Sequence, residues 1–300
     1  MYVLIFLLLV FIFVLLISLY MVSRTIYPKT KTHKSTFQHE IEQGSFTKEY
    51  FDNLQKEEIK INSGSGYNIN SLYFPCAGSK LLVVIAHGFS YTLFGSIKYV
   101  KMFHEMGISA LVYDHRYHGL SGGKNTTFGY REKEDLKTIL DYVYERFGDN
   151  IIVGTHGESL GGATVLMHGA MDHRVNFIIS DCAFSSLKAE ISYRIKQDNK
   201  LPAFPFVYLA SFITGIITGA FYSRVSPAGT AGKIKSPVMI IHGKQDDYTP
   251  YEHGLEIYSN LKCSKHFYGA EGAGHAKSIM TDTSRYTNEV KQFLRDNNIL

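Results

Sequence analysis

The stretch Asn150–Ala163, NIIVGTHGESLGGA, constrains the fold more than any other part of this sequence. Its β-branched residues, Ile151–Val153, favour a buried strand, and the run from Ala163 to His168 is compatible with a helix. Ser159 lies between the two, with a glycine two positions away on each side. So tight a turn strains its central residue, and side chains in place of the glycines would collide with the neighbouring strand and helix. The stretch therefore predicts a strand, a sharp turn that exposes the serine hydroxyl, and a helix.

Apolar runs that recur along the chain predict a mostly parallel β-sheet covered by helices on both faces, which is an α/β fold. The expected strands are Glu58–Asn62, Tyr67–Phe74, Leu81–Ala86, Ser109–Tyr113, Ile151–Val153, Asn176–Ser180, Val238–His242 and His266–Tyr268. Apolar residues at helical spacing predict helices between them, including Ile97–Met106 and Glu132–Phe147. Ligand sites in such sheets lie at the carboxyl ends of the strands, so catalytic residues should directly follow strands.

The N-terminal run Tyr2–Val22 is apolar and carries no charged side chain. As a helix rising about 1.5 Å per residue it would extend about 30 Å, which matches the hydrocarbon core of a bilayer. A cleaved signal peptide is the alternative. However, the run is too long, no basic residue precedes it, and no clear cleavage site follows it. We therefore predict an uncleaved transmembrane anchor over residues 1–22.

The four basic residues that follow the anchor predict its orientation. They are Arg24, Lys29, Lys31 and Lys34, and no acidic residue occurs before Glu40. The positive-inside rule then places the C-terminal side in the cytoplasm. Residues 23–56 are polar and mixed, and they are interpreted as a linker with a short helix near Thr47–Gln55. These four charges equal the formal net charge of +4, so the neutral remainder gives no electrostatic reason to expect nucleic-acid binding.

An insertion over about residues 185–234 interrupts the alternation of strands and helices. Its centre, Leu201–Tyr222, is apolar enough to resemble a second membrane helix, but two prolines and two glycines divide it. A second span would also separate the two halves of one continuous sheet. We therefore expect a helical cap over an apolar pocket. Its aromatic residues suit acyl-chain binding or simple packing, and they are Phe204, Phe206, Tyr208 and Phe212.

Polar residues with complementary chemistry follow three of the expected strands. Ser159 follows the first of these strands, Asp246 and Asp247 follow the second in the run HGKQDDYTP, and His275 follows the third in EGAGHAKSI. The order Ser, Asp, His is that of hydrolases in which the serine occupies a G-x-S-x-G turn between a strand and a helix. The three strand ends therefore predict a catalytic triad.

From residue 57 to the end the chain resembles the α/β-hydrolases, close to a bacterial membrane-anchored or secreted esterase-like branch with a helical cap. The matching segments are His87-Gly88-Phe89, Asp114, His118-Gly119-Leu120-Ser121-Gly122, the turn at Ser159, HGKQDDYTP and GAGH. Tyr117 departs from the pattern, because relatives usually carry glycine before His118. This difference affects a loop and no catalytic atom.

The resemblance implies a role for each site residue. Ser159 would be the nucleophile, and His275 the base that activates it and later protonates the leaving group. Asp246 would fix the imidazole tautomer. The backbone N–H groups of Phe89 and Leu160 would form the oxyanion hole.

Several residues near these motifs have competing interpretations. Asp247 and Asp181 are the alternatives to Asp246, because each also follows a predicted strand. Ser90 and Tyr91 are candidates for lining the substrate pocket. Glu158 is expected to be an exposed neighbour of the nucleophile, and the histidines near the motifs are expected to brace loops.

Other functional classes find less support in the sequence. It contains neither H-E-x-x-H nor a G-K-[ST] phosphate loop, and its three cysteines are too scattered for a metal cluster, so no metal or cofactor is expected. The prediction is a serine hydrolase that cleaves a carboxylic ester or thioester with an apolar acyl group, acting on a small or lipid-like molecule. A serine peptidase, an acyltransferase and a non-catalytic membrane-anchored binding protein with the same fold remain alternatives.

Overall fold

Eight strands form one sheet in the order β1-β2-β4-β3-β5-β6-β7-β8 in the computed structural model, which describes residues 1–300. The strands are β1 (Glu57–Asn62), β2 (Asn68–Phe74), β3 (Leu81–Ala86), β4 (Ser109–Tyr113), β5 (Ile152–Glu158), β6 (Phe177–Asp181), β7 (Val238–Gly243) and β8 (Lys265–Ala270). Strand β2 pairs antiparallel with β1 and β4, and every other pair is parallel. All eight predicted strands are confirmed, with small differences at their ends except in β5, which extends five residues past the predicted Val153 to Glu158.

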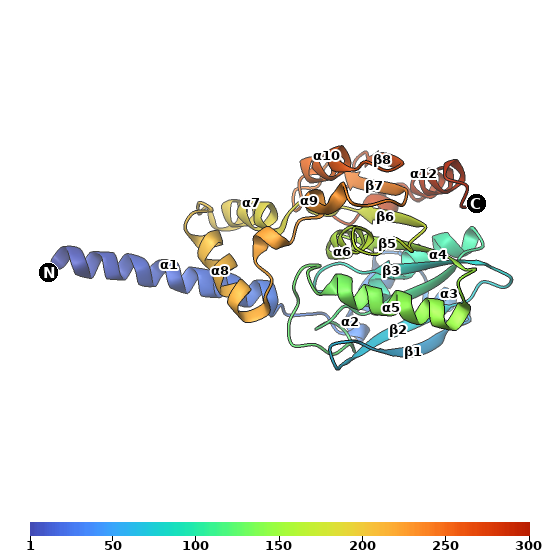
Figure 1. Ribbon diagram of the computed structural model, residues 1–300, viewed down its shortest axis with the longest axis horizontal. Helices are drawn as coiled ribbons and strands as arrows, with labels where there is room; N and C mark the ends of the chain where they lie inside the picture. The colour runs from blue at the N-terminus through green and yellow to red at the C-terminus, as the bar shows by residue number, and fades with distance from the viewer.

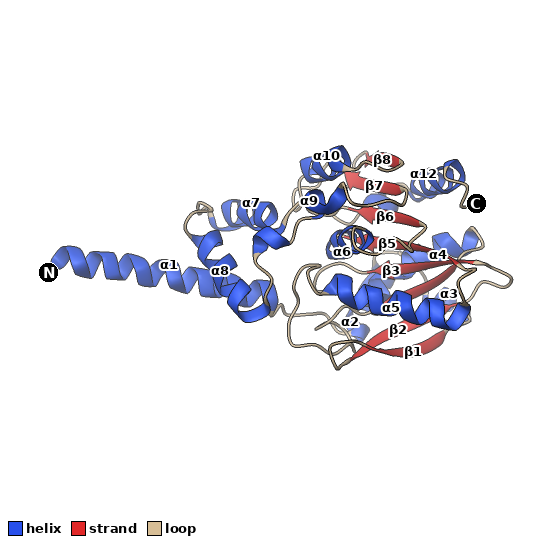
Figure 2. Cartoon of the chain, in the orientation of Figure 1, coloured by secondary structure: helices blue, strands red, loops and turns tan.

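Helices cover both faces of the sheet, as Figure 2 shows with the strands in red and the helices in blue. They are η1 (Leu93–Ser96), α4 (Ile97–Glu105), α5 (Glu132–Phe147), α6 (Leu160–Gly169), α10 (Tyr251–Asn260), α11 (Ser278–Thr281) and α12 (Thr283–Asp296). Strand β3 illustrates why both faces are apolar. Leu82 and Val84 belong to the core that contains α5 and α6, whereas Val83 and Ile85 belong to the core that contains α4 and α12. Successive side chains of a strand point to opposite faces, so a strand buried on both sides is a continuous apolar run.

The first 56 residues of the chain differ in part from the sequence prediction. Helix α1 runs from Tyr2 to Ile26, and the expected linker over residues 23–56 contains two more helices, α2 (His33–Glu42) and α3 (Lys48–Asn53). The short helix expected near Thr47–Gln55 is confirmed as α3, whereas α2 and the last turn of α1 occupy residues that were expected to be linker. Phe37 and Phe51 make edge-to-face contacts with each other and with Phe94 of η1, with ring centroids 5.2–5.5 Å apart, and this aromatic cluster packs the segment against the sheet domain.

The insertion between β6 and β7 forms the predicted helical cap. It contains α7 (Leu187–Asn199), α8 (Phe206–Thr218), η2 (Tyr222–Arg224) and α9 (Pro227–Ala231). Figure 1 shows α7 and α8 beyond one end of the sheet, with α8 beside the C-terminal half of α1. Helix α1 is long and apolar enough to cross a membrane, whereas the 13 residues of α8 extend only about 20 Å.

Candidate active site

Ser159 occupies the turn between β5 and α6 with φ 55° and ψ −111°. This is a strained conformation for a residue with a side chain, and the surrounding strand and helix hold it in place. A Cβ on Gly157 would collide with the backbone of Gly161, and a Cβ on Gly161 would collide with the carbonyl oxygen of Ala86 at the end of β3. The steric reason inferred from the sequence for these two glycines is therefore confirmed.

The structure brings Ser159, His275 and Asp246 together at the carboxyl ends of three strands. His275 lies in the loop after β8, and its Nε2 is 3.0 Å from Ser159 Oγ. Its Nδ1 is 2.8 Å from Oδ2 of Asp246, which lies in the loop after β7. The three side chains form one hydrogen-bonded chain. In this chain Nδ1–H donates to the carboxylate, and the Nε2 lone pair accepts from the serine hydroxyl.

The surroundings of Asp246 keep its carboxyl ionised. Its Oδ1 accepts hydrogen bonds from the backbone N–H groups of Tyr248 (3.0 Å) and Thr249 (2.8 Å). Burial opposes ionisation, but hydrogen bonds from His242, His275 and Thr249 outweigh it and hold the pKa of Asp246 below its usual value. A permanently charged carboxylate at this position fixes the orientation of the His275 ring.

The two alternative carboxylates do not contact His275. Asp247 is exposed, and its backbone carbonyl accepts a hydrogen bond from the Tyr193 hydroxyl at 3.2 Å. Asp181 is fully buried and accepts a hydrogen bond from Ser278 Oγ at 3.0 Å. Burial, together with the charge of Glu158, raises the pKa of Asp181 to about 7.

The candidate oxyanion hole lies between the loop after β3 and the start of α6. A Cβ on Gly88 would be 3.7 Å from Ser159 Cβ, so the backbone that leads to Phe89 passes directly beside the serine. The Phe89 N–H donates to no backbone acceptor. Leu160 is the first residue of α6, so its N–H has no acceptor within the helix. Both N–H groups are therefore free to bind a developing oxyanion.

Histidines brace the loop that carries Phe89, as the sequence predicted. His118 Nε2 accepts from the backbone N–H of Ser90 at 3.1 Å, and His87 Nδ1 donates to the carbonyl of Gly88 at 2.7 Å. Burial lowers the pKa of His87 and of His118, so both rings are neutral.

Tyr117, the departure from the family pattern, has φ 62°, which is the left-handed region that favours glycine.

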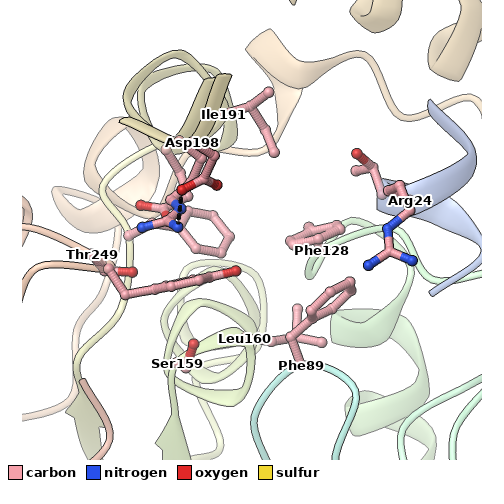
Figure 3. Close-up of a pocket in the computed structure, with 13 residues that line it drawn as sticks. Arg24, Phe89, Phe128, Ser159, Leu160, Ile191, Asp198 and Thr249 are labelled. Carbon is pink, nitrogen blue, oxygen red and sulfur yellow. Dashed lines mark hydrogen bonds and ion pairs between the residues drawn. The ribbon is translucent and has the colours of Figure 1, made fainter. Parts of the chain in front are cut away.

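An apolar cavity of about 260 Å³ lies above Ser159 on the cap side. Figure 3 shows Phe89, Phe128 and Leu160 around it, with Ile191 of α7 on the cap side. Arg24 and Thr25, from the C-terminal end of α1, also belong to the wall, as do Glu190, Arg194 and Asp198 of α7. None of the four cap aromatics named in the sequence analysis lines this cavity. Phe206 is buried, whereas Phe204, Tyr208 and Phe212 are exposed.

A second cavity, of about 320 Å³, opens beside the serine and is polar. Ser159 and His275 belong to its lining, together with Glu40, Ser90, Tyr91, Lys98, Glu158 and Lys277. The expectation that Glu158 is exposed is wrong. Its side chain is buried. Lys98 Nζ and the Tyr99 hydroxyl each lie 2.6 Å from its Oε2, and these contacts compensate the carboxylate for the loss of water.

Sequence reasoning missed several residues of this site, and Tyr248 and Lys98 are two examples. The Tyr248 ring stacks on His275, with centroids 4.9 Å apart, and it lines both cavities. Its position two residues after Asp246 was the available signal. Lys98 lies on α4, far from every motif, so no local pattern could have associated it with Glu158.

Comparisons with known proteins identify the family of this chain. A family model described as serine aminopeptidase, S33, matches residues 77–208. The uncharacterized protein YqkD of Bacillus subtilis (strain 168) is 31% identical over 275 residues, which cover 91% of this chain and 90% of that protein. The human alpha/beta hydrolase domain-containing protein 17B is 23% identical over 251 residues, covering 81% of this chain and 78% of that protein. The chain belongs to the α/β-hydrolase family.

A solved structure gives the same fold. The esterase Pf2001 of Pyrococcus furiosus superposes with a TM-score of 0.68 at 20% identity, covering 84% of this chain and 94% of that one. At this level of identity the similarity supports the fold alone. Fold and family together indicate a hydrolase.

Proposed function

We propose that this protein is a serine hydrolase that cleaves a carboxylic ester or thioester with an apolar acyl group. The observation that carries the proposal is the hydrogen-bonded chain Ser159–His275–Asp246, which lies between an apolar and a polar cavity. The apolar cavity suits an acyl chain, and the polar cavity suits a leaving alcohol or thiol. The two sides of the substrate would then lie on opposite sides of the serine.

The reaction follows from these contacts. Ser159 Oγ attacks the carbonyl carbon while His275 Nε2 takes its proton, and Asp246 stabilises the imidazolium that forms. The N–H groups of Phe89 and Leu160 bind the oxyanion, and each such donor typically contributes about 3 kcal/mol to transition-state stabilisation. The imidazolium returns its proton to the leaving group. A water molecule, deprotonated by His275, then attacks the acyl-enzyme, releases the carboxylic acid and restores the serine.

One observation favours a second candidate, an aminopeptidase. Glu40 lines the polar cavity, and its buried Oε2 has no hydrogen-bond partner. A carboxylate in this position would attract the amino terminus of a peptide, and the matching family model is described as a serine aminopeptidase. An acyltransferase would use the same residues with an alcohol in place of water.

A series of p-nitrophenyl esters distinguishes these candidates. We expect kcat/KM to rise with acyl length, by about fourfold for each methylene that the cavity buries, because burial of a methylene contributes about 0.8 kcal/mol. The value of kcat/KM should level off once the acyl chain is longer than the cavity can hold. Aminoacyl p-nitroanilides are expected to react far more slowly. Turnover of the anilides, with no ester cleaved at any length, would establish the aminopeptidase instead.

Glu190 is an acidic residue in the wall of the apolar cavity. Burial raises the pKa of its carboxyl to about 8, so it is uncharged at neutral pH. The charged and titratable groups that act on it are Arg194 and Asp198 on α7, Asp246, and His253, whose Nε2 is 3.8 Å from Glu190 Oε2. The neutral form keeps this wall compatible with an acyl chain.

Activity toward an apolar ester should therefore fall as pH rises through about 8, because the raised pKa makes Glu190 neutral below that pH and charged above it. Glu190→Gln keeps the shape without the charge, so its kcat/KM should stay flat over the same range. The profile is measured with p-nitrophenyl butyrate after subtraction of spontaneous hydrolysis. If kcat/KM of Glu190→Gln fell in the same way at alkaline pH, the effect would belong to another group.

A further inference from the structure

The packing of α1 against the cap limits where a membrane can lie. Residues 1–13 of α1 are exposed, but from Val14 onward the helix packs against the rest of the protein. Ser18 Oγ donates to the carbonyl of Phe206 on α8 at 3.2 Å, and the Phe13 and Phe206 rings make an edge contact at 6.1 Å. Thirteen residues extend only about 20 Å, less than the roughly 30 Å of a bilayer core. If α1 crosses a bilayer, the part of α1 that contacts α8 must therefore lie inside it.

The outer surface of α8 has the chemistry that this position requires. Tyr208, Phe212 and Ile216 recur every four residues and form a single stripe, the α8 stripe, whose side chains are 51–67% exposed. Phe204, in the turn before α8, is 72% exposed and its ring contacts that of Tyr208. Residues spaced by four lie on one face of a helix. The sequence of α8, FVYLASFITGIIT, contains no charged residue. Basic residues occur just outside it, as at the edge of a membrane-embedded segment. They are Lys200 before it and Arg224 after it. Lys188 of α7 places its ammonium 4.5 Å from the centroid of the Tyr208 ring, so a basic group also borders the stripe itself.

A groove connects this region with the candidate active site. It lies between α1 and α7 and is lined by Tyr20, Met21, Ile191 and Ile195 among others. Arg24, Thr25, Ile191, Arg194 and Asp198 line both this groove and the apolar cavity above Ser159. The α1 residues that line the groove lie one to two helical turns from the α1 residues that contact α8. An acyl chain in the bilayer beside α1 would reach the cavity along this groove, past Arg24 and the Arg194–Asp198 ion pair.

We propose that α8 lies in the bilayer beside α1, and that the substrate is a membrane-resident ester or thioester whose acyl chain enters through the α1–α7 groove. The substrate half of this proposal rests on the proposed serine hydrolase function. The placement of α8 does not. The occupant of the α8 stripe is lipid, because the stripe continues the apolar surface of a helix that is itself long enough to span a membrane.

Tryptophan fluorescence tests the placement of α8 without any need for activity. The chain contains no tryptophan, so a single introduced one reports on its own surroundings. The full chain is reconstituted in phosphatidylcholine vesicles, with or without bromine atoms on the acyl chains. Phe212→Trp is expected to be quenched by the brominated lipid, as is Leu9→Trp in the exposed part of α1. Leu255→Trp, at a 45% exposed position on α10, should not be quenched. Equal emission from Phe212→Trp in the two lipids would overturn the proposal.

A pair of substrates tests the access route. The variant Phe212→Glu/Ile216→Glu changes only exposed positions that line neither cavity. It should hydrolyse soluble p-nitrophenyl butyrate within about twofold of the unmodified protein. It should hydrolyse a fluorogenic long-chain ester held in vesicles about tenfold more slowly or worse, because acidic side chains are costly in hydrocarbon. Leu255→Glu is the matched control for added charge.

The outcomes separate the two proposals. Unchanged vesicle activity in Phe212→Glu/Ile216→Glu would overturn the membrane route while leaving the hydrolase function standing. Absence of turnover of either ester by the unmodified protein would instead refute the hydrolase function, and with it the substrate half of this inference. Quenching at Phe212→Trp would still establish the position of α8.

Discussion

Ser159→Ala is expected to abolish labelling by a fluorophosphonate probe and to lower kcat for ester hydrolysis by roughly 10⁴- to 10⁶-fold. The reason is that Ser159 Oγ is the atom that would form the acyl-enzyme, and it is the hydroxyl hydrogen-bonded to His275 Nε2. The substitution removes one oxygen atom. It leaves unchanged the glycines that hold the turn and the backbone N–H groups of the oxyanion hole.

The experiment uses the full chain in detergent or vesicles, because α1 packs against the cap. Labelling is followed by gel fluorescence, and thermal unfolding followed by circular dichroism shows whether the variant is folded. Ser259→Ala, on the exposed side of α10, is the matched control and should be labelled normally. Labelling that survives in a folded Ser159→Ala protein would disprove the nucleophile assignment.

Asp246→Asn is expected to lower kcat by about 10⁴-fold with little change in KM, because an amide no longer stabilises the imidazolium or selects the correct tautomer. An asparagine can donate its N–H₂ to His275 Nδ1. The ring proton would then move to Nε2, which could no longer accept the serine proton. The charged partner that would be lost lies 2.8 Å from the ring.

The neighbouring Asp247→Asn provides a control one position away. Asp247 contacts the cap through its backbone carbonyl, so its variant should keep kcat within about twofold, as expected for an exposed surface change. Asp181→Asn tests the other alternative. A loss of similar size in either of these variants, with Asp246→Asn fully active, would reassign the acid of the triad.

Much of the fold was predictable because its determinants are local. A strand buried on both faces must be a continuous apolar run, and Leu81–Ala86 shows this pattern without reference to any other segment. The turn at Ser159 was predictable in part for the same reason, since a Cβ on Gly157 would collide with Gly161 in the same turn, although the need for glycine at 161 comes from the Ala86 carbonyl on β3. The linker prediction failed over α2 because Phe37 becomes partly buried only through contacts with Phe51 and with Phe94, which is more than fifty residues away.

The candidate site was also predictable only in part. Strand-end position and residue order singled out Ser159, Asp246 and His275, and their catalytic roles stay predictions until the variants are measured. Sequence left Asp181 and Asp247 as alternatives, because the direction of a loop side chain does not follow from its neighbours along the chain. The contact between His275 and Asp246 distinguishes these carboxylates only in three dimensions.

The sequence alone therefore determined the strands, the strained serine turn, the order of the three site residues and the apolar N-terminal helix, because each depends on short-range backbone sterics or on hydrophobic periodicity. Only the tertiary structure decided that Glu158 is paired with Lys98, that Tyr248 stacks on His275, and that the end of α1 forms a wall of the cavity above Ser159. These features arise from contacts between segments distant in the chain. Such contacts depend on how the helices and loops pack around the sheet, which no local pattern specifies.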